Sequence, residues 1–420
     1  MATTGQRRTD TIVAGRIIRN VDEKIWNPEF AGSATPLTTL MNNMKNREAT
    51  SNMKFEVYED VLNNRRTTIL SFDASGVTST IFQITTTDAP YVALNSQLKN
   101  LKTGENYFVT AITAGGVVTV QRDFAGTLTT PSVSTTTTDR LMILGEALPE
   151  GGVSRNGITR DAEASYNYCQ FFRTSVQMSD ILIGTKTYGG KDWLYQRDKK
   201  MLEHKLKIEL SLWLGERFAQ ADVASTDGYI YTTGGVIQHI KGNVLDVSGA
   251  AYSGILTLKV LDRFGEKMSL NGSDTKHVFC GPRFFSALNS IGNNKLRLND
   301  SASSLGMNIV EYVTHGLRLK FVNAKKVFES DPSLTTGTLA GTGVCLDLKY
   351  LKYEYFDGLD TKLHEEVQEN DRAGKKDEWR TVAGLKMWQY GLDHSYNASS
   401  GVPEEFAGVH GKIIGVSDYM

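Results

Sequence analysis

The chain contains few cysteines and no long apolar run. Its three cysteines, Cys169, Cys280 and Cys345, lie far apart in the 420 residues and form no C-x-x-C pair. This usage favours buried thiols in a reducing cytoplasm over a disulfide framework or a zinc site. The sequence also lacks the run of about 18 apolar residues that a membrane helix needs, and its N-terminus, MATTGQRRTDTIVAG, has no apolar signal core. Neither export nor membrane spanning is indicated.

A strong charge of either sign is absent as well. The 46 basic and 47 acidic residues leave a net charge of -1, so the composition offers no electrostatic basis for general binding to nucleic acid or to a membrane. With 22% charged and 40% hydrophobic residues, the composition is that of a folded globular chain. Its length suffices for about two or three domains.

Signatures of catalysis and phosphate binding are missing too. The seven histidines are dispersed, and neither a G-x-S-x-G elbow nor a complete phosphate-binding glycine motif occurs. The nearest match, the GTG run that begins at Gly341, lacks its third glycine. His204 lies between Glu203 and Lys205 in a charged segment, where we expect a solvated side chain without the orienting partner that acid-base catalysis needs. We therefore predict no enzyme activity, no catalytic residues, no cofactor and no metal site.

One long charged helix is the most prominent feature that is present. The segment KDWLYQRDKKMLEHKLKIELSLWLGERF, at about 190–218, predicts a helix far longer than the ~11 to 12 residues usual in globular proteins. Asp198 and Lys205 interrupt any heptad register, which favours the support of a large flat shell over a coiled coil. The spacing of its apolar residues predicts that one face packs in the core, Leu206 included. These residues are Leu194, Met201, Leu202, Leu206, Leu210, Trp213 and Leu214.

The N-terminal part predicts an extended arm followed by strands. Residues 1 to about 50 are polar, and their apolar anchors follow no lasting period, so we expect an arm that packs on something other than itself. From Met53 the pattern alternates, in MKFEVYEDV and then RRTTIL, as in a hairpin. The anchors are Ile17, Ile18, Ile25, Trp26, Phe30, Leu37 and Leu40.

Residues from about 75 to 147 differ in composition from their surroundings. They are rich in Thr, Val, Ile and Gly, and they contain the strand-like segments IFQIT, NYFVTAIT, GVVTVQR and DRLMILG between turn residues. Short strands at this spacing predict a small β-barrel or sandwich. After Pro149 the chain returns to a further strand, CQFFRTSVQMSDILIG, that precedes the long helix. The β-module is therefore predicted to be an insertion.

The remainder mixes helices and strands and closes with an antiparallel pair. Between 223 and 344 we expect strands near GYIYTTG and KHVFC, a helix from about Ser253 to Met268, and a second helix with Pro282 in its first turn. The segments VCLDLKYLKYEYFDGLDTKLHEEV and DEWRTVAGLKMWQYGLDHSY alternate on either side of the charged turn ENDRAGKK. They predict a broad hairpin.

The order of these parts resembles that of the major capsid proteins of tailed bacteriophages, the Hong Kong 97-type fold. It is most similar to the subgroup whose extended loop carries an inserted β-domain. The resemblance rests on TYGGKDWLYQRDKKMLEHKLKIEL at the start of the long helix, TGENYFVTAITAGGVVTVQRDFAGT in the β-module, HVFCGPRFFSAL, and the strand pair KYLKYEYFDGLD and EWRTVAGLKMWQYGL.

The resemblance implies an α+β fold with a defined layout. It places an N-terminal arm at 1–50; an extended loop at 51–168 with a small β-barrel or sandwich at about 75–147; a first peripheral part at 169–222 with a spine helix at about 190–218; an axial domain at 223–344; a second peripheral part of antiparallel strands at 345–396; and a C-terminal tail at 397–420.

The resemblance also implies a function without catalysis. The chain would self-assemble, as pentamers and hexamers, into the icosahedral capsid around the double-stranded DNA genome of a tailed phage. Assembly would take place in the bacterial host cytoplasm, with portal, scaffolding and decoration proteins as further partners. Contact with DNA would be weak and non-specific, because acidic residues offset the basic residues of the arm. These basic residues are Arg7, Arg8, Arg16, Arg19 and Lys24.

The alternative is another phage structural or binding protein, such as a tail, decoration or adhesive component. Such a protein would explain the β-rich module and the lack of catalytic motifs. It would not explain the long helix. An enzyme ranks third, because no nucleophile, base or metal set can be named.

Overall fold

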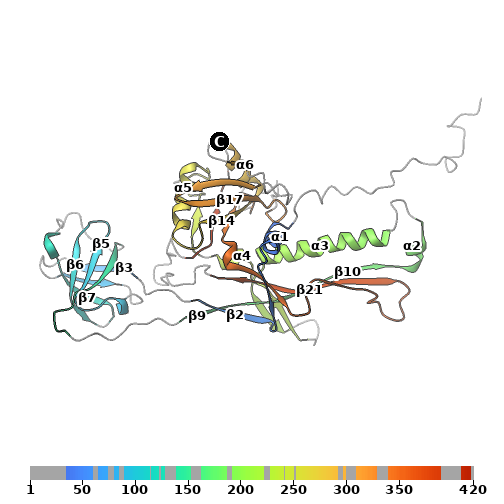
Figure 1. Ribbon diagram of the computed structural model, residues 1–420, viewed down its shortest axis with the longest axis horizontal. Coiled ribbons are helices and arrows are strands. Elements are labelled where there is room, and N and C mark those ends of the chain that lie inside the picture. Colours follow the sequence, from blue (N-terminus) through green and yellow to red (C-terminus); the bar gives the residue numbers. More distant parts are fainter. Residues whose placement is uncertain are drawn as a thin grey trace, which may run out of the picture. The chain divides into compact units, whose positions relative to one another are not determined.

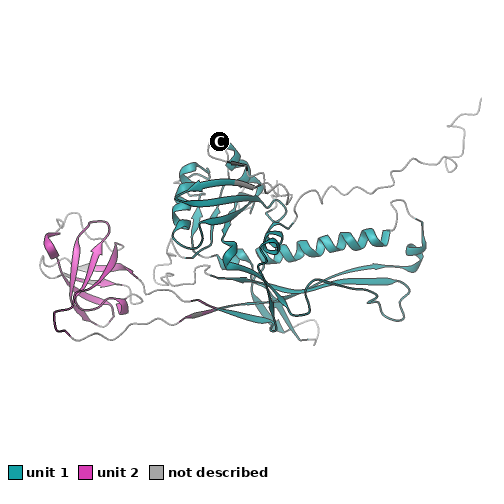
Figure 2. Ribbon diagram, in the orientation of Figure 1, with its two compact units in different colours: residues 1–57, 165–420 teal, residues 58–164 magenta. Residues whose placement is uncertain are grey.

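The computed structural model describes residues 35–59, 65–73, 80–84, 89–113, 115–122, 124–127, 139–152, 162–186, 192–221, 228–240, 242–249, 252–291, 297–298, 309–328, 339–388 and 408–417. The chain divides into two compact units (Figure 2). The first unit comprises residues 1–57 and 165–420, and the second comprises residues 58–164.

A long helix lies along a twisted sheet in the first unit (Figure 1). In strand β10, every second side chain from Phe172 to Met178 is buried, which is the pattern of a sheet covered on one face. The covering helix is α3, Asp192–Leu214. The sheet has the order β1-β19-β21-β10, where β1 is parallel to β19 and the other pairs are antiparallel. Its strands are β1 (Arg47–Thr50), β19 (Leu351–Phe356), β21 (Lys375–Met387) and β10 (Gln170–Met178), and β20 (Lys362–His364) pairs with β21.

A seven-stranded sheet forms the other layer of the first unit, in the order β13-β22-β18-β14-β17-β16-β15. Its two faces are both buried: Val278 and Phe321 pack with α5 and α6, whereas Phe279 and Val322 join the core that includes Trp213 of α3. The elements are β13 (Val244–Asp246), β22 (Gly411–Ile414), β18 (Gly343–Leu346), β14 (Thr275–Cys280), β17 (Leu317–Asn323), β16 (Ile309–Thr314), β15 (Arg297–Leu298), α5 (Leu258–Ser269) and α6 (Pro282–Ser290).

Shorter elements complete the first unit. Two pairs of strands form separate two-stranded sheets, β2 with β9 and β11 with β12. These strands are β2 (Lys54–Glu59), β9 (Glu163–Tyr168), β11 (Phe218–Ala221) and β12 (Tyr229–Thr232), and the short helices are α1 (Pro36–Asn43), α2 (Asp180–Gly184) and α4 (Val236–His239).

The second unit is a closed barrel. Six antiparallel strands follow one another around it in the order β3-β4-β7-β6-β5-β8, and its interior is filled by side chains such as Ile69, Leu98, Tyr107 and Val118. The strands are β3 (Arg66–Asp73), β4 (Thr80–Ile84), β7 (Val117–Gln121), β6 (Asn106–Thr113), β5 (Ser96–Asn100) and β8 (Arg140–Glu146). The predicted small barrel is confirmed, with β4, β6, β7 and β8 at the four predicted segments.

The start of the barrel is earlier than predicted. Its first strand, β3, begins at Arg66 and not near residue 75, and it pairs with β4 and β8. The predicted hairpin between MKFEVYEDV and RRTTIL is wrong, because β2 pairs with β9. Alternation reveals that both segments are strands but does not encode their partners, and the partner of β2 lies about a hundred residues away in sequence.

The barrel boundary leads to a testable prediction. Residues 58–164, expressed alone, are expected to unfold in one cooperative transition, because they contain all six strands. Residues 75–147 lack β3, which carries the buried Ile69 and closes the ring, so they should show no cooperative transition. Thermal circular dichroism compares the two fragments. A cooperative melt of residues 75–147 would show that β3 is dispensable.

Part of the predicted arm packs within its own subunit. α1 buries Leu37, Leu40 and Met41, and β1 adds to the five-stranded sheet beside β19. Pro36 at the start of α1 suits a helix N-terminus, but a helix of only eight residues is too short for its period to be recognised. The other predicted anchors, from Ile17 to Phe30, lie outside the described residues.

Two strands of the seven-stranded sheet come from segments to which the sequence assigns other positions. β18, at the start of the predicted closing hairpin, and β22, in the predicted tail, are neighbours in the seven-stranded sheet. β18 is buried throughout, so it lacks the alternation that would distinguish its sheet. β19 and β21 do form the predicted antiparallel pair, with Leu351 opposite Met387.

The buried face of α3 differs from the predicted one. His204, Ile208, Glu209, Leu212 and Trp213 are buried. Of the seven predicted core residues, only Trp213 belongs to this set; Leu206 is half-buried, and Leu194, Leu202 and Leu214 are 40 to 42% exposed. The side chains at 204, 208 and 212, which are four residues apart, form a regular buried stripe on the helix. This stripe faces β10 and contains a histidine.

α3 also ends earlier than predicted. Gly215 follows its last residue, and a Cβ at this position would collide with the carbonyl oxygens of Ser211 and Thr233. The Gly215 carbonyl accepts a hydrogen bond from the Gly235 amide at 2.7 Å. This close approach of two backbones requires glycine and stops the helix.

Candidate functional site

The three cysteines of the chain are held in an unreactive state. Cys169, Cys280 and Cys345 are buried, and burial raises the pKa of the Cys169 and Cys345 thiols to about 12 and that of Cys280 well above its usual range. Such thiols are poor nucleophiles, because the thiolate is the reactive form. Within the described ranges, no group of His, Cys, Asp and Glu is placed to hold a metal ion, and no helix is long and apolar enough to cross a membrane.

The prominent features are instead buried polar side chains whose hydrogen bonds join segments that are distant in sequence. We call each such group a tie. Glu209 of α3 is fully buried, and its two carboxylate oxygens accept hydrogen bonds from the amides of Leu37 at 2.8 Å and Thr38 at 3.0 Å. The indole of Trp213 donates to the same carboxylate at 3.0 Å. Burial raises the pKa of Glu209, while these donors act in the opposite direction. The carboxylate takes the place of a side-chain N-cap on α1, which Thr35 does not supply.

His204 forms a second tie, and its predicted solvent exposure is wrong. The imidazole is completely buried between α3 and the sheet, with Nδ1 3.0 Å from the Thr174 hydroxyl and Nε2 2.8 Å from the Thr381 hydroxyl. Thr381 in turn donates to Thr361 at 2.9 Å. Burial, with a smaller effect of Lys207, lowers the pKa of His204 to about 4. The neutral imidazole fixes α3 over β10 and β21.

A third tie joins the C-terminal segment to the seven-stranded sheet. The buried ammonium of Lys276 donates to the carbonyls of Met268 at 2.7 Å, Asn271 at 2.6 Å and Val409 at 3.0 Å. These three acceptors use its three N–H groups. Nearby, the Asp347 amide donates to Nδ1 of His410 at 3.2 Å, so Nε2 carries the proton and donates to a backbone carbonyl at 3.0 Å.

These buried histidines make folding stability depend on pH. Burial lowers the pKa of both His204 and His410 to about 4 from an ordinary 6.5. A base with a lowered pKa contributes stability that is complete above the ordinary value and is lost as the pH falls toward the lowered one. Protonation of each histidine should therefore lower the free energy of unfolding by up to about 3 kcal/mol between pH 6.5 and 4.

Urea unfolding over this pH range tests the prediction. His204→Gln cannot take up the proton, so its unfolding free energy should fall less steeply with decreasing pH than that of the wild type. His315→Gln, at an exposed turn, is the matched control and should keep the wild-type slope. The same slope in His204→Gln and the wild type would contradict the prediction.

The outer face of the five-stranded sheet carries a charged cluster. Arg173 forms a two-pronged ion pair with Glu378 on the neighbouring strand, at 2.8 and 2.9 Å, and Arg380 donates to the same carboxylate at 2.6 Å. The Arg173 hydrogen bond lowers the pKa of Glu378 to about 2, against the effect of burial. The cluster links β10 to β21 where the sheet faces away from α3.

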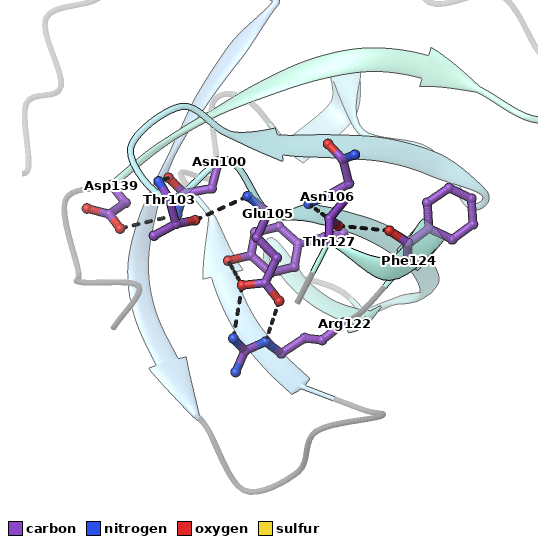
Figure 3. A network of polar contacts seen from close by, with 9 residues as sticks. Asn100, Thr103, Glu105, Asn106, Arg122, Phe124, Thr127 and Asp139 are labelled. Atoms are coloured by element: carbon purple, nitrogen blue, oxygen red, sulfur yellow. Dashed lines mark hydrogen bonds and ion pairs between the residues drawn. The ribbon is translucent and has the colours of Figure 1, made fainter. Parts of the chain in front are cut away.

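The barrel contains its own polar network (Figure 3). The guanidinium of Arg122 donates to both oxygens of Glu105, at 2.8 and 2.9 Å, and both side chains are buried. The Tyr107 hydroxyl also donates to Glu105, at 3.3 Å. A buried pair with such geometry costs about 3 to 5 kcal/mol to break from one side. It holds the start of β6 to the end of β7.

Two cavities of the first unit lack an organised reactive centre. The larger, of about 730 Å³, lies beside α5, where Asp262 accepts hydrogen bonds from the hydroxyls of Tyr312 at 2.6 Å and Thr314 at 2.9 Å. The smaller, of about 320 Å³, lies between α1, α3 and the sheet; there Arg47 pairs with Asp360 and lies over the ring of Tyr353. The polar groups in both serve the packing of neighbouring elements.

These features are those of a structural protein. Buried hydrogen-bonded groups hold its layers together, and its three thiols are buried in the core. A family model described as SU10 major capsid protein matches residues 2–390. The chain therefore belongs to the SU10 major capsid protein family, and it is a structural capsid subunit of tailed phages with no enzymatic role.

Solved structures of capsids resemble the chain weakly. The capsid of a native GTA particle covers 91% of this chain and 95% of its own at 8% identity, with a TM-score of 0.44. A chain of Mycobacterium phage Adephagia covers 99% of both at 8% identity, with a TM-score of 0.43. The capsid of Myoviridae phage XM1 covers 96% and 99% at 12% identity, with a TM-score of 0.41. A search of curated proteins yields no match.

Proposed function

We propose that copies of this subunit close into an icosahedral shell around double-stranded DNA, with the layout of the Hong Kong 97-type fold. We assign the five-stranded sheet and α3 to the peripheral domain, the seven-stranded sheet with α5 and α6 to the axial domain, and the barrel with β2 and β9 to the extended loop. Support comes from membership of the capsid family and from the order of these elements along the chain.

The observation that carries this proposal is that α3 is held firmly within its subunit and still exposes aliphatic side chains. One face of the helix is tied to the sheet through His204 and to α1 through Glu209. The helix also leaves Leu194, Leu202 and Leu214 exposed in the single subunit. Exposed aliphatic side chains on a stiff element suit a wall that is completed by neighbouring copies.

The partners follow from the same argument. We propose pentamers and hexamers of the chain itself, with the portal and with scaffolding and decoration proteins as further partners, assembled in the host cytoplasm. Contact with the packaged DNA should be weak and non-specific, because the chain carries a net charge of only -1.

Sedimentation of the expressed protein tests the proposal. Wild-type protein should migrate in a gradient as large particles that appear as closed shells in negative-stain micrographs. A protein that sediments only as a monomer or a small oligomer at every concentration would contradict it.

A further inference from the structure

An aromatic surface covers one end of the first unit. Tyr166 and Tyr168 of β9 lie edge to face at 5.7 Å, Tyr168 lies 5.4 Å from Tyr231 of β12, and Tyr231 is stacked on Tyr229 at 6.2 Å. Tyr229 is 67% exposed. These rings present flat apolar area with polar tips, which is the composition of a binding hot spot. We call Tyr166, Tyr168, Tyr229 and Tyr231 the tyrosine face.

Two cations give the tyrosine face a positive edge. The Arg217 guanidinium lies 4.0 Å from the ring centre of Tyr166, and the Lys54 ammonium lies 4.4 Å from the same ring. Lys54 is paired with Glu56, but Arg217 contacts no carboxylate among the described residues; it donates to the Tyr166 carbonyl at 2.6 Å. The face therefore holds an aromatic floor beside the positive charge of Arg217.

An aliphatic knob of opposite character lies elsewhere on the same unit. α2 has the sequence DILIG, and its Ile181, Leu182 and Ile183 are all exposed, Ile181 by 85%. Asp180 precedes them, is exposed, and forms no ion pair within the described ranges. We call Asp180–Ile183 the knob. Solvent-exposed aliphatic clusters of this kind are typical of interaction sites.

The knob and the tyrosine face cannot meet within one subunit. β10 connects their neighbourhoods: Gln170, at its start, bonds to Thr233 just after β12, and its last residue, Met178, is followed within two residues by α2 (Figure 1). At ~3.3 Å per residue, the nine residues of β10 separate the two ends by roughly 30 Å. Any contact between them joins two copies.

We propose that the knob of one subunit docks on the tyrosine face of the next. Ile181 lies on the rings of Tyr229 and Tyr231, and Asp180 approaches Arg217. Aliphatic side chains on aromatic rings bury area at both partners, and the charges are complementary. Because the two surfaces differ and lie at opposite ends of a long strand, the contact is head to tail, which generates closed rings or extended arrays of copies. The inference rests on the proposed shell.

Disulfide trapping in assembled particles tests the contact. The Ile181→Cys and Tyr229→Cys double variant, treated with a mild oxidant, should give a ladder of dimers, trimers and larger covalent species on a non-reducing gel, because each copy carries both halves. The native cysteines are buried, so their background is low. Each single variant should stay monomeric, as should the pair Ile181→Cys and Leu270→Cys, whose second position is equally accessible but outside the tyrosine face.

Four outcomes are informative. A ladder confined to the double variant supports the contact. Wild-type shells without a ladder in the double variant contradict the contact and leave the shell intact, whereas a dimer from Ile181→Cys alone shows that knob meets knob and also contradicts it. Absence of wild-type shells contradicts the proposed function itself.

A charge placed in the knob provides a test without cysteines. Ile181→Asp should leave the melting temperature of the free subunit unchanged, since the side chain is 85% exposed. It should lower the yield of particles at least ~10-fold, because a charge that weakens one contact ~10-fold, or by ~1.4 kcal/mol, weakens every copy of that contact in the shell. Leu270→Asp, on an exposed position after α5, is the matched control and should assemble normally. A wild-type yield of Ile181→Asp particles would overturn the proposal.

Discussion

Leu212→Asp is expected to eliminate folded subunit altogether. Leu212 is completely buried in the core that α3 shares with α1 and both sheets. A carboxylate there has no partner, and burial of an unpaired polar group costs several kcal/mol, a large part of the ~5 to 15 kcal/mol that stabilises a typical domain. Soluble yield and near-ultraviolet circular dichroism measure the loss of the packed core.

Leu202→Asp is the matched control on the same helix. Leu202 is 40% exposed, so the new carboxylate stays in water and the subunit should fold with nearly wild-type stability. Leu206→Asp, at a half-buried position, should lie between the two variants. Equal loss of folded protein in Leu202→Asp and Leu212→Asp would contradict the face that the structure assigns to the core.

Glu209→Ala should have the next largest effect. The substitution leaves the buried amides of Leu37 and Thr38 and the Trp213 indole without their acceptor. Each unsatisfied donor costs about 1 to 3 kcal/mol, so the free energy of unfolding should fall by about 3 kcal/mol or more. Hydrogen exchange should show the loss first in α1, because the carboxylate is the cap of that helix.

Two further substitutions sharpen this test. Glu209→Gln keeps one acceptor oxygen but turns an NH₂ group toward a backbone amide, so its loss should be intermediate. Glu203→Ala, at a partly exposed position paired only with Lys200, should cost less than about 1 kcal/mol. If the backbone amides of α1 exchange as slowly in Glu209→Ala as in the wild type, the packing of α1 is sufficient to stabilise the helix without the carboxylate cap.

The local pattern was sufficient to locate the elements that have a regular period. The presence of the long helix α3, four strands of the barrel and the pairing of β19 with β21 follow from alternation and from helix spacing. The pairing partners of β2, β18 and β22 do not follow from the local pattern. Each of these strands pairs with a segment that is distant in sequence, and buried strands lack alternation.

The buried face of α3 was missed for a chemical reason. Apolar spacing assigns polar residues to solvent, yet His204 and Glu209 are buried because Thr174, Thr381 and the amides of α1 satisfy them. Each of these partners is at least 30 residues away in sequence. No local signal identifies such a tie, and three of the leucines predicted for the core, Leu194, Leu202 and Leu214, are exposed in the single subunit.

Electron cryomicroscopy of the particles formed by the expressed protein tests the central claim most directly. We expect closed shells with icosahedral symmetry, in which the five-stranded sheet and α3 form the wall and the exposed leucines of α3 are covered by another copy. Open filaments, small rings or a monomeric protein under the same conditions would contradict it.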